Sequence, residues 1–149
     1  MRKSILLLGI CFILCSCPEV RGTDIYDYSI VNSSHKTVTM FLYKNDLRDI
    51  SSKVTLQHGE KLQKRFEASK PASGLSMWAL FNSETSGFTS DIEIIFDNNK
   101  KIIYHTCTDY VCNNPRNIFD NTHNDQLVEV YTIVDEDYQN ATDCGGSCY

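Results

Sequence analysis

The sequence predicts an all-β protein, specifically an antiparallel β-sandwich of about seven to eight strands, immunoglobulin-like or similar, with a short C-terminal helical turn. Three observations support this fold class. Apolar and polar residues alternate over most of the chain, a pattern typical of half-buried strands. Asn, Asp, Ser and Gly separate these segments, and no helical pattern of about ten residues follows the N-terminal region. A length of 149 residues fits one domain.

Four strands are expected in the first half of the chain. They are centred on Tyr26–Ile30, Val38–Tyr43, Lys53–Leu56 and Leu62–Phe66. The turns Asn32-Ser33-Ser34 and Gln57-His58-Gly59 separate them. Lys61, Lys64 and Arg65 mark the fourth segment as an edge strand, because cations on an edge discourage pairing with other chains.

The middle of the chain contains the clearest hairpin. Met77–Phe81 is compact and apolar, and we expect Trp78 to anchor it in the core. Two β-branched segments, Ile92–Phe96 and Ile102–Tyr104, then flank the Asx-rich turn 97–100. This arrangement predicts a tight antiparallel hairpin.

The last third is expected to begin with a long loop. Cys107–Asp125 contains few apolar anchors, so a disulfide is expected to hold it. Leu127–Val134 predicts a strong final strand. Asp135 is expected to cap the short helical turn that follows.

The N-terminus has the pattern of an export signal. Arg2 and Lys3 precede the apolar segment Ile5–Leu14. Ten residues extend only about 15 Å as a helix, half the hydrocarbon thickness of a bilayer, so a secretory signal is favoured over a membrane span. We therefore predict a signal peptide at 1–16, a tether at 17–24 and a single β-sandwich domain at 25–149.

The end of this signal resembles a bacterial lipobox. In Leu14-Cys15-Ser16-Cys17 an aliphatic residue lies three positions before a Cys, and a small residue lies directly before it. The resemblance implies that Cys17 is lipidated and begins the mature chain. The alternative is ordinary cleavage, for example after Gly22, in a eukaryotic secreted protein. Asn32 and Asn140 would then be glycosylation acceptors.

The chain has seven cysteines, and export accounts for this odd number. Two are removed with the signal, one is the lipid acceptor, and four remain: Cys107, Cys112, Cys144 and Cys148. An even set in an oxidising compartment predicts two disulfides, and three pairings stay open. A zinc site that adds His105 or His123 is the weaker alternative, because the cysteine spacings differ from those of common zinc knuckles.

Charge and motifs limit the possible functions. The formal net charge of −5 becomes −7 once Arg2 and Lys3 leave, because 12 basic residues then face 19 acids. Binding to nucleic acid is therefore not expected, since it requires clustered cations. No Gly-x-Ser-x-Gly or other catalytic motif is present, so we expect no enzyme activity and no cofactor or metal.

Weaker site patterns remain as alternatives. Asp120, Asn124 and Asp125, or the acidic run Asp135–Asp137, offer oxygen ligands for calcium, although neither matches an EF-hand. Surface positions are expected for all four histidines: His35, His58, His105 and His123. Most of the 8 Tyr, 7 Phe and 1 Trp should lie in the core, with a glycan platform as the alternative.

Two further segments resemble a known family. Tyr28–Ser34 is a strand that ends in an Asn-Ser turn, and Tyr131–Ala141 is a strand followed by an acidic turn. Together with the lipobox, they are similar to small uncharacterised lipoproteins of Bacteroidetes-type bacteria. The resemblance implies a cell-envelope location and a β-sandwich, and it implies no activity.

These observations lead to one expected function. The chain is expected to be a lipid-anchored cell-envelope protein, held at the outer membrane, and a non-catalytic binding or structural module. Loops such as Asn82–Thr89 and Cys107–Asp125 would contact a protein or glycan partner. The alternatives are a secreted, disulfide-stabilised inhibitor or effector, and a small hydrolase.

Overall fold

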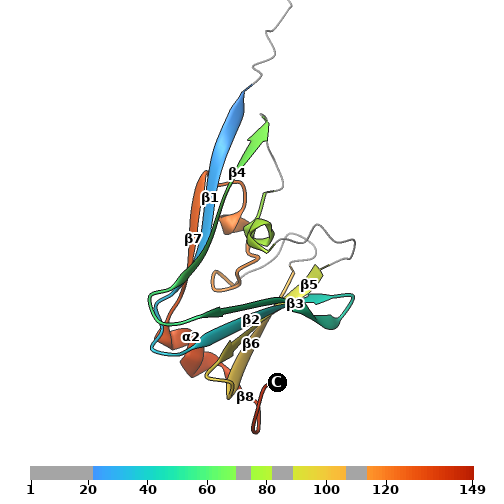
Figure 1. The fold of residues 1–149 in the computed structure, drawn as a ribbon, viewed down its shortest axis with the longest axis vertical. Coiled ribbons are helices and arrows are strands. Elements are labelled where there is room, and N and C mark those ends of the chain that lie inside the picture. Colours follow the sequence, from blue (N-terminus) through green and yellow to red (C-terminus); the bar gives the residue numbers. More distant parts are fainter. Residues whose placement is uncertain (1–21, 70–74, 82–88, 107–113) are drawn as a thin grey trace, which may run out of the picture.

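The structure, a computed structural model, describes residues 22–69, 75–81, 89–106 and 114–149. Within these ranges eight strands form two sheets, which confirms the all-β sandwich class (Figure 1). The first sheet has the order β4 (Lys61–Ser69), β1 (Thr23–Asn32), β7 (Val128–Ile133). The second has the order β3 (Leu47–Leu56), β2 (Val38–Lys44), β5 (Thr89–Phe96), β6 (Lys100–His105), β8 (Thr142–Asp143).

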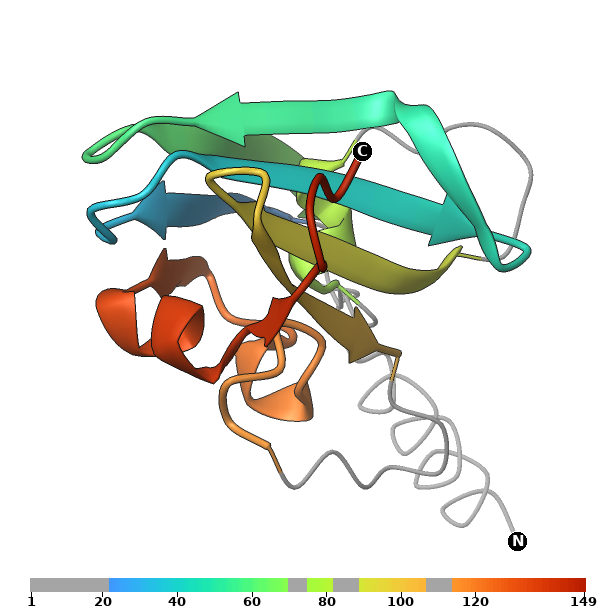
Figure 2. The ribbon, with the colours of Figure 1, turned by 90° about the horizontal axis from the view of Figure 1, so that it is seen from below.

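The two sheets cross at a steep angle. In Figure 1 the strands of the first sheet run upright while β2 and β3 run across the view, and Figure 2 shows the second sheet from below. The turn at residues 57–60 joins β3 to β4, so this connection is a corner from which the two edge strands diverge. Such orthogonal packing leaves space between diverging edges.

One strand pair differs from the predicted antiparallel arrangement. β1 pairs with β4 antiparallel but with β7 parallel, with Ser29 opposite Val130. A parallel partner requires a long crossover rather than a hairpin. The chain between Asn32 and Val128 supplies it: it runs through β2 to β6, and the β6–β7 connection, the last part of this crossover, returns it to the first sheet.

Both tight hairpins are explained by residues with positive φ. Asp97 and Asn98 have φ of 48° and 56°, which confirms the predicted β5–β6 hairpin. Asn45 and Asp46 have φ of 49° and 62° and join β2 to β3, a hairpin that the sequence analysis did not predict. Asn and Asp tolerate the left-handed region that type I′ turns require.

Side chains from both sheets and from the connecting segments form one core. Its fully buried members include the predicted strand residues Tyr28, Ile30, Met40 and Ile94. Ile118 and Phe119 also belong to it, so the expectation of few apolar anchors is wrong for the second half of the 107–125 loop. These two residues hold the crossover against the core.

The compact apolar segment Met77–Leu80 is a 3-10 helix, η1. Met77 is its fully buried residue. Trp78 is half-buried and stacks on Phe119, with ring centroids 3.7 Å apart. The anchor in this segment is therefore Met77, and Trp78 covers the crossover instead of entering the centre of the core.

The predicted helical turn is the short helix α2 (Asp135–Asn140), but its cap differs from the prediction. The carboxylate of Asp137, not Asp135, accepts from the backbone N–H of Val134 at 2.8 Å. Asp135 is the first helical residue and accepts from the backbone N–H of His35 at 2.9 Å. The 3-10 helix η2 (Asn121–His123) precedes β7. No helix within the described ranges has the length and apolar character needed to cross a membrane.

Candidate functional site

The predicted lipid acceptor and half of the predicted disulfide cysteines lie outside the described residues. These are Cys17, Cys107 and Cys112. Cys144 and Cys148 form a disulfide, with Cα atoms 5.4 Å apart. Of the three pairings left open by the sequence, this bond excludes the two that would join the C-terminal tail to the 107–125 loop.

Two of the four histidines lie together: the rings of His35 and His58 stack with centroids 5.0 Å apart. Three of the four contact a carboxylate through Nδ1: His35 with Asp135, His105 with Asp91 and His123 with Glu129, at 2.7, 2.6 and 2.7 Å. His58 Nδ1 contacts the carbonyl of Ser34 at 2.8 Å. The side chain of His123 is only 15% exposed, so the expectation of a surface position is wrong for this residue.

The acidic residues considered as calcium ligands make hydrogen bonds and ion pairs with other parts of the protein. The carboxylate of Asp120 accepts from the N–H of Thr122 at 2.9 Å, and that of Asp125 accepts from the N–H of Leu75 at 2.8 Å. Asp137 pairs with Arg116, whose Nε donates at 3.0 Å. Across the described ranges, no group of three or more His, Cys, Asp or Glu side chains is placed to hold a metal.

One of the two glycosylation sequons is inaccessible. Asn32 is fully buried, and its Nδ2 donates to the carbonyls of Lys36 and Leu56 at 2.8 and 3.0 Å. Its Oδ1 accepts from Ser34. The side-chain amide of Asn32 thus makes four hydrogen bonds at the corner between the sheets and has a structural role. Asn32 therefore cannot carry a glycan in the folded protein.

A buried acid lies on the outer face of the second sheet. Glu93, on β5, has no exposed surface and accepts from Arg48 at 2.6 Å and Lys101 at 3.0 Å. The Tyr43 hydroxyl donates to it at 3.3 Å. Desolvation lowers the pKa of Arg48, but the hydrogen bond with Tyr43 and the charge of Glu93 outweigh it and raise this pKa, so the guanidinium stays charged.

The C-terminal tail, residues 142–149, covers this face. Figure 2 shows it rising from β8 across the strands of the second sheet. Arg48 donates to the carbonyl of Cys148 at 3.2 Å, and the ring of Tyr149 packs against Phe41 with centroids 5.6 Å apart. Phe41 is consequently only 2% exposed although it points away from the core. The tail therefore covers the part of the outer face around Phe41 and Arg48, whereas Ile103 on the same face stays 37% exposed.

On the opposite side of the second sheet, an irregularity in β3 opens a pocket. Between the pairs Leu42–Asp49 and Met40–Val54, four residues of β3 face a single residue of β2. β3 therefore has three more residues than β2 at this point, and the N–H of Leu42 donates to the Ser52 hydroxyl at 2.7 Å. Bulges of this kind redirect side chains and are frequent beside functional sites.

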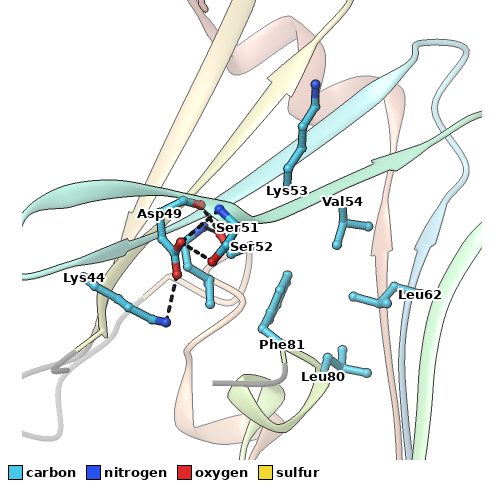
Figure 3. A pocket seen from close by; sticks show the side chains of 10 residues that line it. Lys44, Asp49, Ser51, Ser52, Lys53, Val54, Leu62, Leu80 and Phe81 are labelled. Carbon is cyan, nitrogen blue, oxygen red and sulfur yellow. Dashed lines mark hydrogen bonds and ion pairs between the residues drawn. The ribbon is translucent and has the colours of Figure 1, made fainter. Parts of the chain in front are cut away.

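The pocket has a volume of about 280 Å³ and lies in the angle between the diverging edge strands (Figure 3). One wall is apolar, and its side chains come from four elements: Leu42, Val54, Leu62, Leu80 and Phe81. The other wall is polar and comes from the end of β2 and the bulge: Lys44, Asp49, Ser51 and Ser52. Figure 3 shows the ammonium of Lys53 pointing away from the cavity.

The polar wall satisfies its own hydrogen bonds. Lys44 pairs with Asp49 at 2.8 Å, and the Ser51 hydroxyl donates to the same carboxylate at 2.5 Å. The Ser52 hydroxyl donates to the carbonyl of Asp49 at 2.7 Å. The hydrogen bonds from Lys44 and then Ser51 lower the pKa of Asp49. The wall is thus a closed network of one cation, one anion and two hydroxyls.

This chemistry suits binding better than bond cleavage. A carboxylate with a lowered pKa is a weak base near neutral pH, and a general base is most effective when its pKa is close to the working pH. Ser51 donates to that carboxylate rather than to a histidine. The volume of the pocket is just below the usual range for small-molecule sites, so the pocket can hold one large apolar group.

Sequence reasoning did not identify this pocket. Leu47–Ser52 lacks a clean alternation because the bulge interrupts it, so the third strand was expected to begin only at Lys53. The Asn45-Asp46 dipeptide was the available signal, since it favours a tight hairpin that would place a strand directly after it. No sequence signal shows that Leu80 and Phe81 face this strand.

Neither a protein-family model, nor a curated protein, nor a solved structure matches the chain.

Proposed function

We propose that this chain is an exported, lipid-anchored protein of the bacterial cell envelope, held at the outer membrane through Cys17, that binds a ligand by one apolar group. The pocket is the observation that carries the binding role. It joins a recessed apolar wall to a polar wall whose charges cancel, so it favours an uncharged apolar group at its base.

The position of the pocket supports recognition of a partner outside the molecule. It opens between two edge strands at a corner of the sandwich, whereas the part of the outer face of the second sheet around Phe41 and Arg48 is covered by the protein's own tail. The pocket walls belong to strands and to η1, which hold them in place. Sites on rigid elements keep their shape in the absence of ligand, which reduces the entropic cost of binding.

The lipid anchor rests on the lipobox-like sequence and on the resemblance to small Bacteroidetes-type lipoproteins. Burial of Asn32 adds support, because it removes one of the two sequons that favoured a eukaryotic secreted protein. A disulfide at Cys144 and Cys148 is compatible with an oxidising envelope compartment.

Metabolic labelling with palmitate tests the anchor. Expressed in a bacterium that processes lipoproteins, the full chain should incorporate label, and Cys17→Ala should abolish incorporation. Cys15→Ala is the matched control, because it changes a neighbouring cysteine but leaves the acceptor in place. Unlabelled wild-type protein, or label that survives Cys17→Ala, would contradict the lipid anchor.

Binding of an apolar dye tests the pocket. We expect the neutral dye N-phenylnaphthylamine to gain fluorescence with the wild-type protein and to lose most of this gain with Leu62→Trp, which fills the cavity. Leu47→Trp is the control, because Leu47 is 74% exposed and outside the pocket. Equal fluorescence of the two folded variants would contradict a binding role for the pocket.

A further inference from the structure

The pocket lies beside an edge strand that can accept another strand. Among the described residues β4 pairs with β1 alone, so its second edge has no strand partner there. It is nine residues long and its register with β1 is continuous from Lys61 to Ser69. A regular edge of this length can add a peptide through main-chain hydrogen bonds.

The other edge at the pocket, β3, is less suited to this role. Its bulge interrupts the regular spacing of backbone groups. The N–H of Ser51 donates to the side chain of Asp49 at 3.0 Å, and the carbonyl of Asp49 accepts from Ser52. These side chains occupy backbone groups that an added strand would need, and bulges are a common means of blocking an edge.

Charge and side-chain alternation on β4 define the peptide. The strand carries three cations and one acid, in a chain of net charge −5. Two of these cations, Lys61 and Arg65, are exposed on its outer face together with Glu67, while Lys64 lies on the other face with Leu62, which points inward and lines the pocket. Because side chains alternate along a strand, an added peptide would place every second residue beside these cations and the others on the pocket side.

We propose that an extended peptide of a partner protein, with alternating acidic and apolar residues, adds to the second edge of β4 and inserts one apolar side chain into the pocket. This inference rests on the proposed binding function and names the class of ligand. The same cations oppose pairing of β4 between two copies of the chain, because like charges would then face each other.

A peptide fits this site better than a glycan. The hydroxyls and the ammonium of the polar wall are already hydrogen-bonded to Asp49. Phe81 is 5% exposed, so it offers no open ring face for a sugar to stack on. A peptide brings its own backbone to β4 and requires from the pocket only apolar contact.

The probe is an acetylated, amidated heptapeptide in which glutamate alternates with valine around a central phenylalanine. Titration against the full mature protein should show binding that weakens as salt rises. The same peptide with lysine in place of glutamate, or alanine in place of phenylalanine, should bind at least about 10-fold more weakly, the effect of about 1.4 kcal/mol. N-methylation of its backbone should abolish binding.

Charge reversal gives the decisive comparison. In the double variant Lys61→Glu with Arg65→Glu, the lysine peptide should bind more tightly than the glutamate peptide. Lys100→Glu on β6 is the matched control and should keep the wild-type preference. Both variants must first show the wild-type dye fluorescence, which establishes that the fold and the pocket are intact.

Three outcomes of the peptide titrations would overturn the inference: no binding of the glutamate peptide, equal binding of both peptides, or a preference that survives charge reversal. A dimer in sedimentation that dissociates on Lys61→Glu would also overturn it, because β4 would then pair with itself. If the dye binds but the peptide does not, only this inference fails. If neither binds, the proposed pocket function fails as well.

Discussion

Replacing Arg48 should destabilise the fold far more than replacing the acid with which it pairs. Glu93 has no exposed surface, whereas the side chains of Arg48 and Lys101 are 21% and 34% exposed. Without Glu93 the two cations can regain water. Without Arg48 the negative charge of Glu93 stays buried and is only partly balanced by Lys101. Leaving a charge buried without its partner is what makes breaking a buried ion pair strongly destabilising.

The magnitude follows from the contacts of Arg48. Arg48→Met keeps the apolar stem but removes a charge-assisted hydrogen bond to Glu93, worth about 1.5–3 kcal/mol. It also removes the hydrogen bond to the carbonyl of Cys148, worth about 1 kcal/mol. The guanidinium lies 5.0 Å from the centre of the Phe41 ring, which adds about 0.5–1 kcal/mol. The expected loss is therefore about 3–5 kcal/mol.

Glu93→Gln should cost about 1–2 kcal/mol, because the amide keeps the shape and part of the hydrogen bonding. The double variant should cost at least about 1 kcal/mol less than the sum of the two, because both changes remove the same contact. Urea unfolding measures these free energies, and Arg48→Met should lower Tm by roughly 10–20 °C.

Lys53→Met is the control for losing an exposed cation from the same strand. Lys53 contacts the tail only through Tyr149, with its ammonium 4.8 Å from the ring centre, so a change below about 1 kcal/mol is expected. The reasoning is refuted if Arg48→Met costs no more than Glu93→Gln, or if the two effects add.

Three further predictions concern the tail, the pocket and a turn. Replacing both Cys144 and Cys148 by Ser should cost about 2 kcal/mol, because the closed loop is short; urea unfolding measures it, and no change would show that the tail holds without the bond. The pKa of Asp49 is lowered in the folded state, so its contribution to stability is present above the unfolded pKa and is lost as pH falls through the folded value. Asp49→Asn should accordingly flatten the loss of Tm below about pH 4, and an unchanged acid profile would contradict this. Gly59 has φ of +80°, and no atom lies within 4 Å of the place that an added Cβ would take, so Gly59→Ala should cost about 1–2 kcal/mol through backbone strain alone; equal Tm values would refute it.

Alternation predicted the strands well wherever one face is buried and the other polar. The β5–β6 hairpin was found because Ile92, Ile94 and Phe96 alternate up to an Asx turn. The same rule failed at β3, where the bulge breaks the period of two. It assigned no element to Met77–Leu80, because a short apolar run does not distinguish a strand from a buried helical turn.

The candidate site was beyond sequence reasoning because its parts are distant along the chain. Asp49 and Phe81 line the same pocket only because β3 and the segment that contains η1 face each other across the corner between the sheets. Glu93 looked like an ordinary polar strand position until the structure placed Arg48 and Lys101 beside it. Pairing across strands depends on register, which the order of residues does not reveal.

The sequence by itself determined the all-β class, most of the strands and the short C-terminal helix, because these depend on local periodicity and turn chemistry. Only the tertiary structure decided the parallel β1–β7 pair, the closed tail and the pocket. Each of these arises where segments from different parts of the chain meet, and there the free energy depends on packing and on shared hydrogen bonds rather than on local preference.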